Sequence, residues 1–381
     1  MNPEREPSRS SISTEAFFPF TCHPGFSRRR FLVGVGALLG ASAAGRGAGD
    51  AASDDGRKVI QEYATVPEDP WAVAHGIRAM GRDFTVRGGR RAVDYLLENV
   101  LTSFPANGMS ALGFHPDVEG HRNAFLKTLL EAGVPLEHRF THHGRPRTLG
   151  DVLEGARALF RPQLVIAEPN ALPWSLIAFT RTTSPLRRQW TNAWGEPVNL
   201  DLVVESALQL HERASLPLAD AMRENRPEEA KAPVHEFTCG GTHMLYALLT
   251  AVHAGYRGTD RLERVRRQTA LMVWRLGADV ELIERFYKDR TAIRGESWFE
   301  LDSKLKLLGH AEECLALAER RGLVTFTAAQ QAHRRVAVRR VRDMLDDLGR
   351  RSLEEARALD RELYRQLIGD VCHARHGLTL V

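Results

Sequence analysis

The sequence lacks most of the motifs that identify an enzyme class on sight. Its 381 residues include four cysteines, and there is no Cys-x-x-Cys-His, His-Glu-x-x-His or Gly-x-Ser-x-Gly motif. These absences exclude attached c-type haem, the metalloprotease zinc helix and the α/β-hydrolase nucleophile. The glycine pairs at 88–89 and 240–241 are too short to form a phosphate-binding loop. Function must therefore be inferred from spacing and composition.

Proline and strand-like patterns are also scarce. No proline follows Pro233, so long helices can follow one another to the end of the chain. Val265, Met272, Leu276 and Val280 recur at helical spacing, and alternating apolar runs are nearly absent. The sequence predicts an all-α fold. Helix starts are indicated at 148–151 and at 352–355, where the residue order is typical of capping boxes.

Charge of one sign is not in large excess. The formal net charge is +4, and 26% of the residues are charged. Leader arginines carry part of the positive charge, and the basic run at 334–342 has helical spacing and is followed by aspartates. This pattern is typical of a solvated helix face, so no nucleic-acid partner is predicted.

The N-terminal region contains an arginine-rich motif followed by a short apolar run. Ser27-Arg28-Arg29-Arg30-Phe31-Leu32 is followed by a weakly apolar run and by small residues at 41–43. This segment resembles a twin-arginine signal peptide, which implies transient contact with the translocation machinery and a periplasmic or extracellular location. The apolar run is shorter than the roughly 20 residues of a membrane span, so no stable span is predicted. We expect a signal peptide with a disordered leader over 1–43, a linker over 44–56 and one helical domain over 57–381.

A weak repeat runs through that domain. Short apolar helices are predicted near Trp71, at 123–132, near Trp174, at 244–255, near His310 and near Cys372, with more polar helices between them. The intervals of about 46 to about 69 residues suit helical hairpins. The pattern resembles the α/α toroid of about six hairpins, shared by terpenoid cyclases, lanthionine cyclases and several carbohydrate-active enzymes. A helical-repeat solenoid is the alternative.

Cysteine and histidine recur together in this domain. The segments 239–243, 310–314 and 372–376 each place a Cys and a His four residues apart, on one face if the segment is helical. Thiolate and imidazole in such pairs can bind zinc. With Cys22 lost with the leader, an odd number of cysteines remains, so a disulfide framework is not expected. A core role for the thiols is the competing interpretation.

Lanthionine cyclases hold zinc in their toroid through a lone Cys and a later adjacent Cys-His pair. By resemblance, Cys239 would be the lone ligand, and Cys372 with His373 or His376 would complete a zinc site. His243 and His310 would then act as acid and base, or complete the coordination. This hypothesis predicts an enzyme with a His-, Cys- and Trp-lined central cavity, acting on an unidentified small molecule, peptide or glycan.

Two further hypotheses stay open. Glu300 and Asp302 beside aromatic residues suit a carbohydrate-active hydrolase or lyase, in which His243 would also take part. Alternatively, the protein is a non-catalytic periplasmic helical scaffold whose His and Cys are structural. For either enzyme, the residues predicted to line the cavity are His75, His121, Trp174, Trp194 and Tyr246.

Overall fold

The computed structural model describes residues 56–229, 231–288 and 295–380. The predicted signal peptide and nearly all of the linker lie outside these residues. The all-α class is confirmed, with fifteen α-helices in the described part of the chain. They are α1 (Arg57–Tyr63), α2 (Pro70–Met80), α3 (Ala92–Asn99), α4 (Pro116–Glu119), α5 (Ala124–Glu131), α6 (Leu149–Leu159), α7 (Leu164–Ala167), α8 (Leu172–Thr182), α9 (Leu200–Arg223), α10 (Thr242–His253), α11 (Arg261–Lys288), α12 (Glu296–Arg320), α13 (Ala328–Arg350), α14 (Leu353–Leu359) and α15 (Arg361–Leu380).

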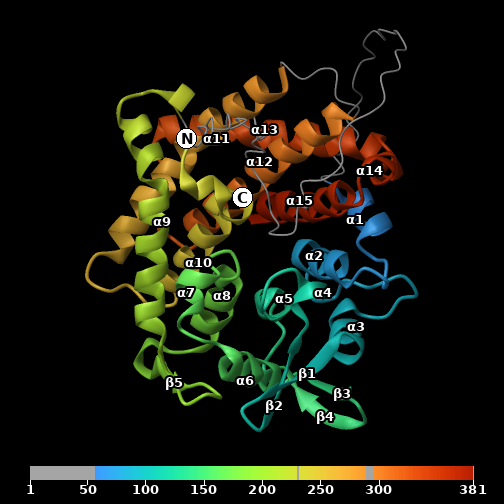
Figure 1. Cartoon of the computed structure of the whole chain (residues 1–381). Coiled ribbons are helices and arrows are strands. Elements are labelled where there is room, and N and C mark those ends of the chain that lie inside the picture. Colours follow the sequence, from blue (N-terminus) through green and yellow to red (C-terminus); the bar gives the residue numbers. More distant parts are fainter. Residues whose placement is uncertain (1–55, 230, 289–294, 381) are drawn as a thin grey trace, which may run out of the picture.

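Six of these helices pack in a continuous circuit (Figure 1). Helix α2 contacts α5, α5 contacts α8, α8 contacts α10, α10 contacts α12, α12 contacts α15, and α15 returns to α2. Each of the six coincides with one of the apolar segments in the predicted repeat. Several of the more polar helices pack against them: α9 and α11 contact α10, and α11 and α13 contact α12. Apolar side chains from α1 through α15 form one contiguous core.

Helices α12 and α15 pack closely against each other. A Cβ at Gly309 of α12 would lie 2.9 Å from the Cβ of Ala374, and one at Gly377 of α15 would lie 2.8 Å from the Glu313 backbone nitrogen. Real Cβ atoms do not come this close, so both positions require glycine for the backbones to approach. Their approach brings the polar side chains of α12 against those of α15.

Local signals define several helix starts. Thr148 and Asp151 form the predicted capping box at the start of α6, and Asp69 caps α2 by accepting from the Ala72 amide. These interactions satisfy amide groups that have no partner inside the helix. Ser352 stands at the N-cap of α14 as predicted, but its side chain accepts no cap hydrogen bond.

Three short antiparallel hairpins depart from the sequence prediction. They are β1 (Leu101–Ala106) with β2 (Met109–Phe114), β3 (Arg139–His142) with β4 (Arg145–Thr148), and β5 (Gln189–Thr191) with β6 (Pro197–Asn199). The segment 198–204 begins in β6 and becomes helical at Leu200. Such short hairpins join helices and carry too few residues for a period-2 pattern to be recognised.

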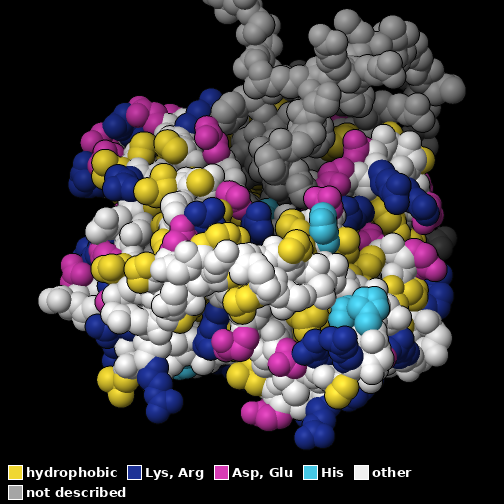
Figure 2. All heavy atoms as spheres, turned by 60° about the horizontal axis from the view of Figure 1, so that its bottom comes forward, with side chains coloured by type: hydrophobic (Ala, Val, Ile, Leu, Met, Phe, Trp, Pro, Cys, Tyr) yellow, Lys and Arg dark blue, Asp and Glu magenta, His cyan; other side chains and the backbone are white. Residues whose placement is uncertain are grey.

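One face of the molecule can be followed in Figure 2. On the face in Figure 2, acidic, basic and apolar side chains are interspersed, and no continuous basic track crosses it. Within the part of the chain that the structure describes, no helix combines the length and apolar character needed to cross a bilayer.

Candidate metal centre

Four histidines and a cysteine meet where the circuit helices converge. His75 comes from α2, His243 from the first turn of α10, His310 from α12 and His373 from α15. The ring centroids of His310 and His373 lie 3.9 Å apart, and His243 lies 4.9 Å from His310 and 5.2 Å from His373. Cys239 precedes α10, and its Sγ lies 3.5 Å from His310 Nε2. We call these five residues the hub.

Three hub residues offer their ligand atoms to a common point. One ligand atom each of Cys239, His243 and His310 lies within 4.8 Å of the other two, and all three residues are buried. A tetrahedral zinc ion, with bonds of about 2.0–2.3 Å, suits ligand atoms at such separations after small side-chain adjustments. These three residues could therefore hold a metal ion.

Hydrogen bonds orient the hub imidazoles. His310 Nδ1 donates to the Lys306 carbonyl oxygen at 2.8 Å, which directs the other nitrogen, Nε2, toward Cys239. His75 Nδ1 donates in the same way to the Trp71 carbonyl. Because a carbonyl only accepts, Nδ1 carries the proton and Nε2 keeps its lone pair. Metal-binding histidines commonly show this arrangement.

Burial keeps the hub histidines neutral. It lowers the pKa of His75 and of His310 to about 3. The pKa of His243 and of His373 also lies well below the ordinary value, chiefly through burial and then through their histidine neighbours. Desolvation penalises the charged imidazolium, and adjacent rings would repel one another if both were charged. Neutral imidazoles are the form that binds metals.

A left-handed turn presents Cys239. The η4 turn (Thr238–Gly241) places Cys239 at φ 51°, Gly240 at φ 63° and Gly241 at φ 81°. Cysteine rarely adopts this conformation, and strained backbone of this kind is concentrated at functional sites. Buried Arg275 holds the turn by donating from Nη1 to the Gly240 carbonyl at 2.8 Å, and Asp279 pairs with Arg275 at 2.8 Å.

Substituting Gly241 with alanine is expected to disrupt this turn. The new Cβ would lie 2.4 Å from Cγ2 of fully buried Val234, at a positive φ. We expect a loss of more than about 2 kcal/mol in unfolding free energy, because left-handed strain alone costs roughly 1–2 kcal/mol, together with weaker metal binding. Urea denaturation and metal titration measure both.

Gly195→Ala is the matched control for Gly241→Ala. Gly195 also has a positive φ, of 78°, but open space surrounds its Cβ position. The Gly195→Ala variant should lose only the unfolding free energy that left-handed backbone strain costs, roughly 1–2 kcal/mol, and should keep its metal affinity. Equal metal affinity in the two variants would contradict a role for the turn in presenting Cys239.

A buried ion-pair network borders the hub. Glu313 of α12 accepts from His373 Nδ1 at 2.8 Å, from His376 Nδ1 at 2.5 Å and from Arg78 Nε at 2.6 Å. Arg78 also pairs with Glu131, which is 2.7 Å from Lys127 Nζ. Arg78 holds the pKa of Glu313 well below its usual range although burial alone would raise it. Ion pairs thus join α2, α5 and α12, and the hydrogen bonds from His373 and His376 add α15.

The network fixes the tautomer and the orientation of His373. Because the Glu313 carboxylate accepts from Nδ1 of His373, the lone pair lies on Nε2. A carboxylate that fixes the tautomer and orientation of a histidine in this way is a recurrent feature of general bases. The His373 ring stacks on His310, so this base would lie beside a candidate metal ligand.

Aromatic side chains flank the hub on another side. Trp174 of α8 stacks on His121, with ring centroids 4.0 Å apart, and contacts His243 at 4.9 Å. Tyr246 of α10 is buried beneath the Arg78 guanidinium, 5.1 Å from it. His75 and His121 are half-buried. Of the five residues predicted to line a cavity, these four therefore lie in or beside the hub.

Trp194 is a correction. It is 41% exposed in the turn between β5 and β6, where the Arg161 guanidinium covers its ring at 5.1 Å. We had expected the loop around it to reach the central cavity. The loop is instead a closed hairpin, because the Asn192 side chain accepts from the amides of Trp194 and Glu196 and so folds the turn on itself.

The ligand set also differs from the one predicted. The structure brings Cys239 together with His243 and His310, rather than with the three C-terminal candidates. Cys372 is fully buried as a free thiol outside the metal group, and burial raises its pKa. His376 contacts Glu313, and His373 lies in the hub as a neighbour of His310. Of the three Cys and His pairs spaced four residues apart, only Cys239 and His243 both belong to this group of potential metal ligands. Cys314, like Cys372, is a buried thiol of the core.

The predicted acidic pair is engaged with lysines. Glu300 Oε1 is 2.7 Å from Lys304 Nζ, and Asp302 Oδ2 is 3.0 Å from Lys306 Nζ. Glu300 is partly exposed, whereas Asp302 is buried. As residues two apart on α12, the two carboxylates point in different directions from the helix, and they do not form a facing pair.

Sequence reasoning missed the charged residues of the network. Arg78, Lys127 and Glu313 each stand within an apolar helical segment and are buried. A lone charge on the buried face of such a helix is costly unless it is paired. That signal alone could have identified all three.

Comparisons with protein-family models, curated proteins and solved structures found no match for this chain. The resemblances drawn from the sequence therefore stay predictions, and the hub itself carries the functional argument.

Proposed function

We propose that this protein is an exported metal-dependent enzyme whose zinc ion is bound by Cys239, His243 and His310. The observation that supports this most strongly is the convergence, within 4.8 Å, of a thiol and an imidazole of the 239–243 segment with an imidazole of α12, all buried. A purely structural thiol would not need a strained left-handed turn to reach His310.

The donor set favours zinc with a catalytic role. A thiolate and two imidazoles suit zinc, and three protein ligands are typical of catalytic sites that keep a fourth position for water or substrate. Bound zinc would lower the pKa of that water and so supply a nucleophile at neutral pH. His373, oriented by Glu313, would move the proton. This combination suits hydrolysis of a small polar substrate.

The circuit of six helices supports the α/α toroid as the architecture around this centre. In an open solenoid the first and last helices would not meet, whereas α2 packs against α15. An ion pair strengthens the closure, because Asp69 at the N-cap of α2 pairs with Arg365 of α15 at 3.2 Å. We propose that the hub occupies the axis of such a ring.

Metal analysis tests the proposed centre. Protein purified without a metal-affinity tag is expected to carry one zinc ion per chain, and removal by a chelator should abolish hydrolysis of a responsive ester, amide or phosphate substrate until zinc is restored. Cobalt substitution should give a thiolate-to-metal charge-transfer band. Less than about half an equivalent of bound metal, against the one equivalent that an intact site holds, would favour the scaffold hypothesis.

The carbohydrate-active alternative has its own test. Glu300→Gln should leave metal content and activity unchanged, because Glu300 is held by Lys304 rather than by the hub. Glycosidase or lyase activity that disappears in a folded Glu300→Gln variant would support that alternative.

We further propose export by the twin-arginine route, which would carry the folded protein with its metal already buried. Replacing Arg28 and Arg29 together with lysine is expected to retain the precursor in the cytoplasm, measured by fractionation and by the size of the chain. Arg5→Lys, in the same leader but outside the motif, is the control. Normal export of the paired variant would contradict the proposal.

A further inference from the structure

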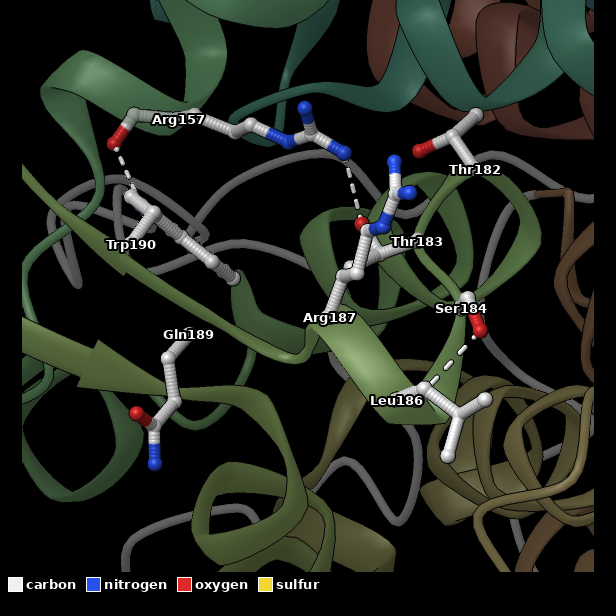
Figure 3. Close-up of a pocket in the computed structure, with 8 residues that line it drawn as sticks. All are labelled: Arg157, Thr182, Thr183, Ser184, Leu186, Arg187, Gln189 and Trp190. Carbon is white, nitrogen blue, oxygen red and sulfur yellow. Dashed lines mark hydrogen bonds between the residues drawn. The ribbon is translucent and has the colours of Figure 1, made fainter.

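A pocket of about 570 Å³ opens at the opposite end of α8 from the hub (Figure 3). The residues that line it are Arg157, Thr182, Thr183, Ser184, Leu186, Arg187, Gln189 and Trp190. They come from the end of α6, the end of α8, the η1 turn (Pro185–Arg187) and β5. Trp174 and Thr182 are eight residues apart on α8, or about 12 Å along its axis, so this pocket is separate from the candidate metal centre.

The lining of the pocket is cationic. It contains two arginines and no carboxylate, and Figure 3 shows the guanidinium groups of Arg157 and Arg187 on the same side. Arg157 pairs with Glu154 at 2.6 Å through Nη1 and donates to Thr183 Oγ1 at 2.6 Å through Nη2. Its Nε is buried and meets no acceptor among the described residues. No carboxylate of the described residues lies within ion-pair distance of Arg187.

Further groups in the lining suit a ligand that has a charged part and an apolar part. The Ser184 hydroxyl and the Gln189 amide add hydrogen-bonding groups beside the guanidiniums. Leu186, 94% exposed, and the Trp190 ring supply apolar surface. Trp190 is fixed by a hydrogen bond from Nε1 to the Arg157 carbonyl at 3.1 Å. A planar guanidinium binds carboxylate or phosphate oxygens in pairs.

We propose that this pocket binds an organic anion, namely a phosphate or carboxylate group carried on an apolar body. Arg157 and Arg187 bind the charged group, while Trp190 and Leu186 contact the apolar part. Arg157 also lies in the last turn of α6, where a cation complements the helix dipole. Arg187 has no such structural role, so it is the residue to test.

Calorimetric titration with inorganic phosphate, phenyl phosphate and benzoate tests the proposal. Phenyl phosphate or benzoate should bind more tightly than inorganic phosphate. Either ligand should also change the fluorescence of Trp190, and the Trp190→Phe variant should not show that change. Arg187→Gln should weaken binding roughly 10-fold or more, as expected for a lost charge-assisted hydrogen bond. Whichever of phenyl phosphate and benzoate binds more tightly identifies the charged group.

Arg188→Gln is the matched control. Arg188 is the exposed neighbour whose guanidinium donates to the Pro185 carbonyl, and it does not line the pocket. It should change binding less than about twofold, since exposed charges act weakly at a distance. Equal weakening by Arg188→Gln, or no saturable binding of any probe by the unmodified protein, overturns the proposal. Binding should persist in Cys239→Ala, so this test is independent of the metal centre.

Discussion

Cys239→Ala is expected to lower zinc affinity by more than about 100-fold. Loss of a residue that merely orients a ligand costs 10- to 100-fold, and Cys239 is the sole thiolate of the proposed set. The fold should survive, because the side chain is small and the turn is held through the Gly240 carbonyl by Arg275. Competition with a chelator of known affinity measures the loss, and circular dichroism verifies the fold.

Cys372→Ala provides the matched comparison for Cys239→Ala. Cys372 is another buried free thiol, fully enclosed in α15 and outside the metal group. Its removal should cost about 1 kcal/mol of unfolding free energy, from lost burial, and leave zinc affinity unchanged. Loss of zinc affinity in both variants would instead restore the ligand set predicted from the sequence, in which both thiols bind the metal, and unchanged affinity in Cys239→Ala would contradict both sets.

Glu313→Gln is expected to be the most destabilising conservative substitution in the ion-pair network that borders the hub. It leaves the buried Arg78 guanidinium without half of its charge compensation, and the amide keeps only one acceptor oxygen where the carboxylate offered two to His373 and His376. Breaking one member of a buried ion pair typically costs about 3–5 kcal/mol. Urea denaturation should show this loss in full at neutral pH.

Two measurements make the Glu313 prediction specific. Glu300→Gln, on the same helix, removes a partly exposed carboxylate paired with Lys304 and should cost less than about 1 kcal/mol. If the two variants lose equal stability, the network is not coupled as the structure indicates. Activity in any variant that remains folded then reports whether orientation of His373 matters for proton transfer.

The effect of Glu313→Gln should depend on pH. The pKa of Glu313 is held well below its ordinary value of 4.5 in the folded protein, so its ionised form contributes stability above about pH 4.5. This contribution is lost as the pH falls toward the folded-state pKa, because the unfolded chain takes up the proton first. Between pH 5 and pH 3 the native protein should lose more stability than the Glu313→Gln variant. A constant difference across that range would contradict the assigned ion pair.

The sequence by itself determined the helical class and most helix positions. The spacing of Val265, Met272 and Leu276 predicted α11, and Thr148 with Asp151 marked the start of α6. These features depend on residues within one or two turns of each other, so they can be recognised without the fold. The same local reasoning selected Cys239, His243 and His310 as chemically important residues.

The tertiary structure alone decided which of these residues meet. Cys372 and His373 are neighbours in the sequence, but consecutive residues on a helix point about 100° apart, so His373 enters the hub while Cys372 enters the core. The roles of Glu313 and Arg78 depend on contacts 235 residues apart, which follow from the approach of α12 to α15 and the return of α15 to α2. Glycines at 309 and 377 permit the first of these approaches. No local pattern contains that information, because it is the packing of whole helices that fixes the distance between the side chains.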